Sequence, residues 1–442
     1  MDKKAIVIGA GLAGCEAAYQ LASRGISVAL YEMKPHQYSP AHHSPNFAEL
    51  VCSNSLRGAG LANAVGLLKE EMRRLDSVIM KAADATSVPA GGALAVDREA
   101  FSAKVTELIR SNPLIQVIEE EVTEIPAEEN LIIATGPLTS ESFSKSIAKF
   151  VGKDYLSFFD AAAPIVTFES IDMSKAFFGS RYNKGTPDYI NCPMTQEEYL
   201  AFYNALKEAE CAQIHDFDHQ VFEGCMPIEE MAHRGEDTMR YGPLKPVGLV
   251  DDRTGKRSYG VVQLRKDNVA GTLYNIVGFQ THLKFPEQKR VFSMIPGLEN
   301  AEFMRYGVMH RNTYLNSPTL LNRDFSMRTN DSIYFAGQIT GVEGYVESAA
   351  SGLMAGLSLS AKILGRDLPY FSDQTAIGAL GQYISTAVAD SFQPMNINFG
   401  IIASLDQRIR IKAERYTAIS NRSLAVIEDI KKESILFKGE KI

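Results

Sequence analysis

Short uninterrupted runs of apolar, often β-branched residues recur along this chain, and small-residue turns follow several of them. Residues 4–8 and 27–31 form two such runs, separated by a helix-like segment. Residues 131–137 and 333–352 repeat the pattern, and the last run leads into a series of small residues. Strands that are buried on both faces have this pattern, as in a parallel sheet covered by helices. The pattern therefore predicts an α/β fold.

The turn after the first of these strands holds three glycines in G-x-G-x-x-G spacing. Gly9 allows a tight turn, Gly11 lets the backbone approach a pyrophosphate, and Gly14 lets helix and strand pack closely. The helix expected over residues 15–23 offers free N–H groups to the phosphates. Glu32 ends the second strand, where a carboxylate accepts hydrogen bonds from the adenosine ribose. The unit predicts a dinucleotide site without distinguishing FAD from NAD.

Two later turns favour FAD over NAD. Flavoproteins with two dinucleotide-binding domains place an Ala-Thr-Gly turn, here residues 134–136, beside the cofactor. In many FAD enzymes a strand that ends in Ala-Gly before a small-residue helix, here residues 333–352, closes over the pyrophosphate and the flavin ring. An acid often follows that Ala-Gly pair, but Gln338 stands there, so we expect a neutral amide to make the contact. The expected cofactor-binding residues are Gly9, Ala10, Gly11, Leu12, Ala13, Gly14, Glu32, Thr135, Gly136, Gly337, Gln338 and Tyr345.

Residues 166–304 differ from the rest of the chain in their pattern of expected elements and motifs. They combine strand-like pieces with a helix over residues 196–210, and they contain no second G-x-G-x-x-G. We expect them to form an α+β insertion domain that shapes the substrate site. It would interrupt a Rossmann-like FAD-binding domain of the two-dinucleotide-binding-domain flavoprotein type, made of residues 1–165 and 305–442.

Basic residues gather in two places. Residues 234–266 carry eight basic residues against four acids, with tyrosines between them. The last seventy residues have a helical, amphipathic pattern, and five basic residues cluster between Leu405 and Leu424. Each cluster fits either a solvated face or a surface that binds nucleic acid.

Composition and charge limit the remaining possibilities. The 442 residues are 45% hydrophobic and 22% charged, as in globular proteins of two or three domains, and no apolar run approaches the ~18 residues of a membrane span. We therefore expect a cytoplasmic protein that does not enter a membrane. A net charge of −8 gives no overall attraction to nucleic acid, although it leaves room for a local basic face. Five cysteines without a C-x-x-C pair predict neither a disulfide framework nor a metal site.

The segments that contain two of the cysteines are the most specific feature of the chain. In residues 50–57 a cysteine is followed by small polar residues and an arginine, which suits a helix start or an anion-binding turn. Together with residues 9–14, 222–229 and 337–345, this segment resembles the folate- and FAD-dependent tRNA (uracil-5-)-methyltransferases. The similarity spans essentially the whole chain. A wider relative, the larger flavoprotein that helps build carboxymethylaminomethyl groups on wobble uridine, is longer than this chain.

The resemblance implies methylation of the T-loop uridine of tRNA at C5. Methylenetetrahydrofolate would give the one-carbon unit, reduced FAD would carry the methylene and reduce it, and NADH or NADPH would reduce the flavin again. Folate needs an open flavin face, so its site is expected to overlap the nicotinamide site, which accounts for the missing NAD domain.

Cys52 and Cys225 match the two cysteines of the family. A thiolate that adds to C6 of uracil makes C5 nucleophilic, and a base must later remove the C5 proton; two thiols can share these tasks. The sequence leaves open which cysteine attacks, with a slight preference for Cys52. Arg57 could lower a thiol pKa or bind phosphate, and Tyr345 could stack on the pterin or the flavin, or belong to the core. The other cysteines (Cys15, Cys192 and Cys211) are expected to be structural.

Three alternatives stay open at this point. The same chemistry could act on ribosomal RNA. The chain could instead be a small-molecule FAD oxidoreductase with structural or redox-active cysteines, or an FAD-bound RNA-binding protein without catalytic thiols. Retention of tRNA and the effect of cysteine substitution distinguish these possibilities.

Overall fold

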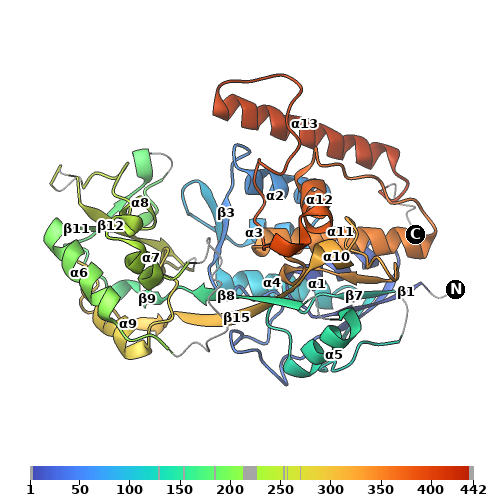
Figure 1. Cartoon of the computed structure of the whole chain (residues 1–442), viewed down its shortest axis with the longest axis horizontal. Helices are drawn as coiled ribbons and strands as arrows, with labels where there is room; N and C mark the ends of the chain where they lie inside the picture. Colours follow the sequence, from blue (N-terminus) through green and yellow to red (C-terminus); the bar gives the residue numbers. More distant parts are fainter. Residues whose placement is uncertain are drawn as a thin grey trace.

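The computed structural model describes residues 3–437 apart from 128–129, 153–154, 184–185, 213–225, 252–253, 256 and 269. Two large sheets organise the described chain, and Figure 1 shows them in separate parts of the molecule. One sheet is parallel and five-stranded, and the other is antiparallel and six-stranded. The chain begins in the first sheet, crosses to the second and returns, so that its last helices cover the first.

The parallel sheet has buried apolar strands, as the uninterrupted apolar runs predict. Its order in space is β16 (Ile333–Phe335), β7 (Leu131–Ile133), β1 (Lys4–Ile8), β2 (Ser27–Tyr31) and β6 (Ile115–Ile118). All three residues of β7 and of β16 are buried. The carboxyl ends of the five strands therefore meet at one edge of the sheet, where an α/β fold binds its ligands.

Helices pack around this sheet and on one another. They are α1 (Leu12–Ala22), α2 (Ala64–Arg74), α3 (Val78–Ala85), α4 (Arg98–Arg110), α5 (Glu141–Val151), α10 (Ser317–Leu320), α11 (Tyr345–Leu364), α12 (Ala376–Thr386) and α13 (Lys412–Glu433). A β-carbon on Gly352 of α11 would lie 2.1 Å from the carbonyl oxygen of Ala13. The small residues of α11 thus let it cross α1 at backbone contact.

The antiparallel sheet belongs to the part of the chain that was expected to be inserted. Its order is β10 (Phe177–Gly179), β11 (Tyr189–Met194), β12 (Gly260–Lys266), β13 (Leu273–Ile276), β9 (Ile165–Thr167) and β14 (Phe303–Arg305). Its helices are α6 (Gln196–Glu208), α7 (Ile228–Arg234), α8 (Thr238–Tyr241) and α9 (Phe285–Phe292). These elements enclose a hydrophobic core of their own around Phe202, Phe279 and Phe292. The predicted fold class is confirmed, whereas the exact boundaries at 165/166 and 304/305 stay a prediction.

Two smaller sheets complete the fold. The strands β8 (Tyr155–Ala162) and β15 (Val308–Leu315) pair antiparallel, and Figure 1 shows this ribbon joining the two parts. The other sheet has the order β3 (Ser55–Gly58), β5 (Ala93–Val96) and β4 (Ser87–Val88). Short 3₁₀ helices span Phe168–Ser170, Arg181–Asn183, Gln338–Thr340 and Ala389–Ser391.

The structure differs from the predicted elements in two places. The first helix begins at Leu12 rather than at residue 15, because Gly11 serves as its N-cap and the turn itself starts the helix. The last seventy residues are helical only in part, since most of residues 387–411, where Pro394 and Gly400 interrupt any helix, lie outside helices. Among the described helices, none combines the length and the apolar character that crossing a membrane requires.

Candidate functional site

A large cavity opens at the carboxyl edge of the parallel sheet. Its empty volume is about 1130 Å³, and its wall includes residues that follow each of the five strands. Of the expected cofactor residues, the cavity is lined by Gly9, Ala10, Gly11, Leu12, Ala13, Glu32, Thr135, Gly136, Gly337, Gln338 and Tyr345. Gly14 is the one expected residue that does not line it. The three small-residue turns therefore converge on one site, although they are far apart in the sequence.

The three glycines of the first turn have different structural tasks. Gly9 has φ +98°, and a β-carbon there would lie 2.7 Å from the carbonyl oxygen of Ala134. A β-carbon on Gly14 would lie only 1.8 Å from the carbonyl oxygen of Gly9, so Gly14 serves the packing of helix on turn. A β-carbon on Gly11 would meet no atom within 4 Å. The open space beside Gly11 faces the cavity, as the approach of a phosphate group requires.

Glu32 lies against the glycine turn. Its Oε2 accepts a hydrogen bond from the backbone N–H of Ala10 at 2.8 Å, and its Oε1 accepts one from the N–H of Lys34 at 3.1 Å. The carboxylate is buried at the end of β2. Its place beside the turn suits the expected ribose contact, which stays a prediction.

The other two turns use left-handed glycines. Gly136 has φ +70° and Gly337 has φ +88°, a region that side chains rarely adopt. The N–H of Gly337 donates to Oγ of Ser351 at 2.6 Å, which fixes this turn on α11. The amide of Gln338 donates to Oε2 of Glu343 at 2.7 Å. An acid therefore does stand near this turn, five residues later than the usual position.

Sequence reasoning missed part of the cavity wall. The loop after β2 contributes Met33, Lys34, Ser39 and His42, which were not among the expected cofactor-binding residues. Two acids after β6, Glu120 and Glu121, also line the cavity. Their position directly after a strand of the parallel sheet could have identified them as residues of the cavity wall.

Tyr345 connects the cavity with Cys52. It begins α11, and its hydroxyl oxygen accepts hydrogen bonds from the backbone N–H groups of Cys52 at 2.7 Å and of Ser53 at 3.3 Å. Burial, followed by the nearby thiol of Cys52, raises the pKa of Tyr345, so its hydroxyl stays protonated. Because Tyr345 and Val51 both line the cavity, the Cys52 segment lies at its border.

The insertion domain holds the Cys52 segment from the other side. Arg265 of β12 donates to Oγ of Ser53 at 2.6 Å and to Oδ1 of Asn54 at 3.1 Å. Arg305, at the end of β14, donates to the carbonyl of Cys52 at 3.4 Å, while its buried Nε has no hydrogen-bond partner in the described part of the chain. Burial and the neighbouring positive charge of Arg98 lower the pKa of Arg305. Cys52 therefore lies at the junction of the two domains, among guanidinium groups.

A buried ion pair fastens this junction. Arg98 of α4 forms two hydrogen bonds to the carboxylate of Asp267, at 2.9 and 3.2 Å, and a third to the carbonyl of Leu50. The side chain of Asp267 is 4% exposed and that of Arg98 is 13% exposed. Burial disfavours the charge on Arg98, but Asp267 outweighs it and raises the pKa of the guanidinium. No pattern in the sequence indicated this pair, because its members lie in different domains.

The remaining predicted residues have mixed outcomes. Arg57 is paired with Glu347, whose carboxylate is fully buried, so its charge is already matched inside the protein. Cys15 and Cys192 are buried, which agrees with a structural role, and burial raises the pKa of Cys15. Cys225 lies outside the described residues, and its role stays a prediction.

Comparisons with known proteins identify the relatives of this chain. A family model described as "Glucose inhibited division protein A" matches residues 4–367. The methylenetetrahydrofolate–tRNA-(uracil-5-)-methyltransferase TrmFO of Acetivibrio thermocellus is 64% identical over 424 residues, which cover 96% of this chain and 97% of that protein. The protein of the same name from Desulforamulus reducens is 61% identical over 98% of this chain and 99% of its own length.

A solved structure extends the comparison to the fold. The GidA protein of Aquifex aeolicus superposes with a TM-score of 0.70 at 15% sequence identity, and the alignment covers 99% of this chain and 75% of that chain. The shared fold spans this whole chain, and the solved protein is the longer of the two.

Proposed function

The chain belongs to the methylenetetrahydrofolate–tRNA-(uracil-5-)-methyltransferase family within the glucose inhibited division protein A group, and we propose that it methylates C5 of the T-loop uridine in tRNA. The donor is methylenetetrahydrofolate and the cofactor is FAD, with NADH or NADPH as the source of electrons. The reaction takes place in the cytoplasm, where tRNA is available.

One observation carries the proposal. The hydroxyl of Tyr345, a residue of the cavity wall, accepts the backbone N–H of Cys52 at 2.7 Å. A cofactor in the cavity and a nucleophilic thiol would therefore work at one location. Three guanidinium groups hold the segment of this cysteine at the border of the cavity, which favours a catalytic role for the thiol over a structural one.

The cavity fits FAD. The open space at Gly11 admits a pyrophosphate at the N-terminus of α1, and the same cavity extends to the turns after β7 and β16. Reduced FAD, when bound, supplies the methylene taken from the folate and the electrons that convert it to a methyl group. Gly11 and the first turn of α1 would bind the phosphates, and Glu32 would orient the ribose.

The cysteines act on the uracil. The thiolate of Cys52 or Cys225 adds to C6, and the electron pair of the C5–C6 double bond makes C5 nucleophilic. After C5 has gained the one-carbon unit, the other thiolate removes the C5 proton. The double bond forms again and the first thiolate leaves, so that uracil keeps one new carbon and neither cysteine is consumed.

The RNA surface is proposed from exposed charge. Arg408, Arg410 and Lys412 are exposed where α13 begins, and Tyr416 stacks on Phe399 at 4.1 Å beside them. Basic side chains next to an aromatic pair suit phosphates and an unstacked base. Arg265 does not belong to such a surface, because it is buried against Ser53 and Asn54.

The test is a transfer assay with folate labelled in the methylene carbon. The holoenzyme, NADH and an unmodified tRNA transcript should give label in 5-methyluridine. A transcript with cytidine in place of the T-loop uridine is the matched control and should stay unlabelled. Label in ribosomal RNA alone would show that ribosomal RNA, and not tRNA, is the substrate. NADH oxidation without any labelling of RNA would show that the protein acts as a flavin oxidoreductase.

A further inference from the structure

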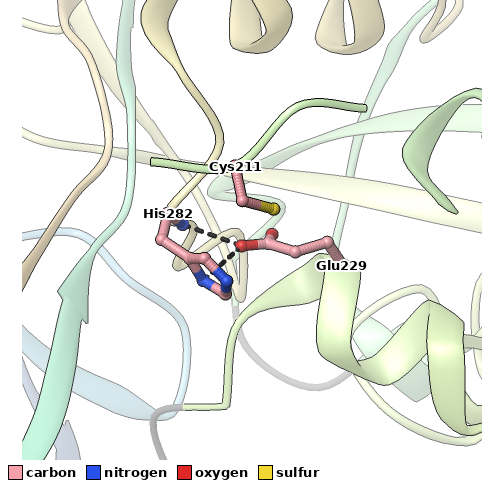
Figure 2. Close-up of side chains that lie close together, drawn as sticks. All are labelled: Cys211, Glu229 and His282. Atoms are coloured by element: carbon pink, nitrogen blue, oxygen red, sulfur yellow. Dashed lines mark hydrogen bonds and ion pairs between the residues drawn. The ribbon is translucent and has the colours of Figure 1, made fainter. Parts of the chain in front are cut away.

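A second cluster of chemically active side chains lies in the insertion domain. Cys211 follows α6, Glu229 lies in the first turn of α7, and His282 lies between β13 and α9. Figure 2 shows the three side chains directed toward one another. We propose that Cys211, Glu229 and His282 bind a divalent cation of the zinc class.

The backbone brings the three residues together. Cys211 forms an antiparallel bridge with Leu283, and the N–H of Ala212 donates to the carbonyl of His282 at 2.8 Å. One ligand atom from each residue of the cluster lies within 4.8 Å of the other two. The set therefore needs only small side-chain movements to close around an ion. Cys211 and His282 are held by backbone pairing, so these movements do not require refolding.

The carboxylate is oriented by its neighbours. Oε1 of Glu229 accepts the backbone N–H of His282 at 2.8 Å, and Oε2 accepts the hydroxyl of Thr281 at 2.8 Å. A carboxylate oxygen has a second lone pair after one such bond, so both oxygens can still bind a cation. Hydrogen bonds that fix a ligand in this way are usual around metal sites.

The histidine is available to a metal. Its Nδ1 lies 2.7 Å from Oε1 of Glu229, yet no described residue offers this buried nitrogen a hydrogen bond of good geometry. The carboxylate oxygen is therefore close to the nitrogen but does not lie along the direction of its N–H bond. A cation between the two atoms would use the lone pairs of both.

The surroundings favour positive charge. The side chain of Glu229 is 1% exposed and that of His282 is 6% exposed, so little water is present to stabilise the carboxylate. A cation bound at this place would neutralise the buried carboxylate.

The ligand set indicates the type of ion. Thiolate, imidazole and carboxylate together suit Zn²⁺ in a tetrahedral site, whereas Mg²⁺ and Ca²⁺ prefer oxygen ligands alone. Three protein ligands leave one position for water or for a fourth residue. The sequence predicted no metal, because the ligands come from three separate segments without metal-binding spacing.

A metal ion at this site would affect the proposed methyl transfer. This part of the inference rests on the proposed function. In the sequence, Cys211 and Glu229 flank residues 213–225, which include Cys225. A cation bound to both flanking residues and to His282 would tie the two ends of that segment to the insertion domain. Metal removal is then expected to lower methyl transfer without loss of FAD.

The test is a cobalt titration of the holoenzyme after chelation and dialysis. Co²⁺ bound to a thiolate in tetrahedral geometry absorbs in the red, beyond the absorption of oxidised flavin. The wild-type chain should bind about one Co²⁺, which Zn²⁺ displaces, and Cys211→Ser and His282→Ala should each weaken binding at least ~10-fold. His233→Asn, which changes an exposed histidine of α7, is the matched control and should bind as the wild type does.

Metal binding is measured without folate or RNA, so its outcome is independent of the methyltransferase proposal. The absence of a cobalt–thiolate band in the wild type, or an unchanged band in Cys211→Ser, would overturn the site. If the variants do not fold, alkylation of Cys211 in the wild-type protein tests whether this thiol binds a metal ion. Zn²⁺ should protect Cys211 from iodoacetamide, as read by mass spectrometry, and equal labelling with and without Zn²⁺ would contradict the proposal.

Discussion

The two large sheets contribute to the site in different ways. The parallel sheet presents backbone turns, and Gly9, Gly136 and Gly337 lie one to three residues beyond the ends of their strands. The antiparallel sheet instead presents long charged side chains, and Arg265 and Arg305 extend from strand ends toward the Cys52 segment. The backbone turns are local in sequence, and they tolerate few substitutions because their glycines have backbone conformations or close contacts that other residues cannot adopt. The contribution of the antiparallel sheet depends on how two domains meet.

The largest expected effect concerns the junction. Asp267→Ala leaves the buried guanidinium of Arg98 without its partner and should lower the free energy of unfolding by ~3–5 kcal/mol. Glu141→Ala removes an exposed pair with Lys145 and is the control, and it should leave the free energy of unfolding close to that of the wild type. Urea unfolding measures both. Equal effects of the two substitutions would show that the junction does not depend on this pair.

A pair of glycine variants separates packing from cofactor binding in the parallel sheet. Gly14→Ala forces a β-carbon against the backbone of Gly9 and should lower the stability of the FAD-free protein by ~1–3 kcal/mol. Gly11→Ala should lower that stability less, by at most ~1 kcal/mol for the loss of the N-cap glycine of α1, and should weaken FAD binding, because its β-carbon enters open space toward the cavity. Thermal unfolding and flavin titration distinguish the two, and normal FAD affinity in Gly11→Ala would argue against the assigned phosphate position.

The link between the two regions is tested by Tyr345→Phe. Loss of the hydroxyl leaves the N–H groups of Cys52 and Ser53 without their acceptor, at a cost of ~1–2 kcal/mol. Methyl transfer should fall while the FAD content stays unchanged. Tyr370→Phe, which changes an exposed tyrosine outside the cavity wall, is the matched control. Full transfer activity in Tyr345→Phe would mean that Cys52 does not need this link.

The smallest expected effect, measured per pH unit, concerns Lys69 beneath the Cys52 segment. Its Nζ donates to the carbonyls of Leu56 and Gly58 at 2.7 Å, and burial, followed by Arg57, lowers its pKa to about 7. Between pH 7 and the ordinary lysine pKa, the unfolded chain binds a proton that the folded chain lacks. Stability should therefore rise with pH in this window, by at most ~1.4 kcal/mol per unit.

Lys69→Met removes that slope, and Lys145→Met, at an exposed position, should keep it. Urea unfolding from pH 7 to pH 10 measures the difference. An identical pH dependence of the wild type and Lys69→Met would show that Lys69 titrates normally in the folded protein.

The same contrast explains how much the sequence could predict. β1, β2 and the glycine turn were predicted from adjacent residues, because buried parallel strands and their turns have local signatures. The Ala-Thr-Gly and Ala-Gly turns could be assigned to the same cavity only by analogy with flavoproteins. The roles of Arg98 and Arg265 could not be predicted, since both depend on contacts between domains. The same is true of the cluster around His282, whose ligands come from separate segments.

The most direct test of the account is methyl transfer by Cys52→Ala beside Cys192→Ala. Both variants should bind FAD as the wild type does. Cys52→Ala should lose at least ~10²-fold in the transfer of label from methylenetetrahydrofolate to tRNA uridine, whereas Cys192→Ala, which changes a buried thiol of the insertion sheet, should retain it. Unimpaired transfer by Cys52→Ala would contradict the claim that the flavin cavity and Cys52 form one active site.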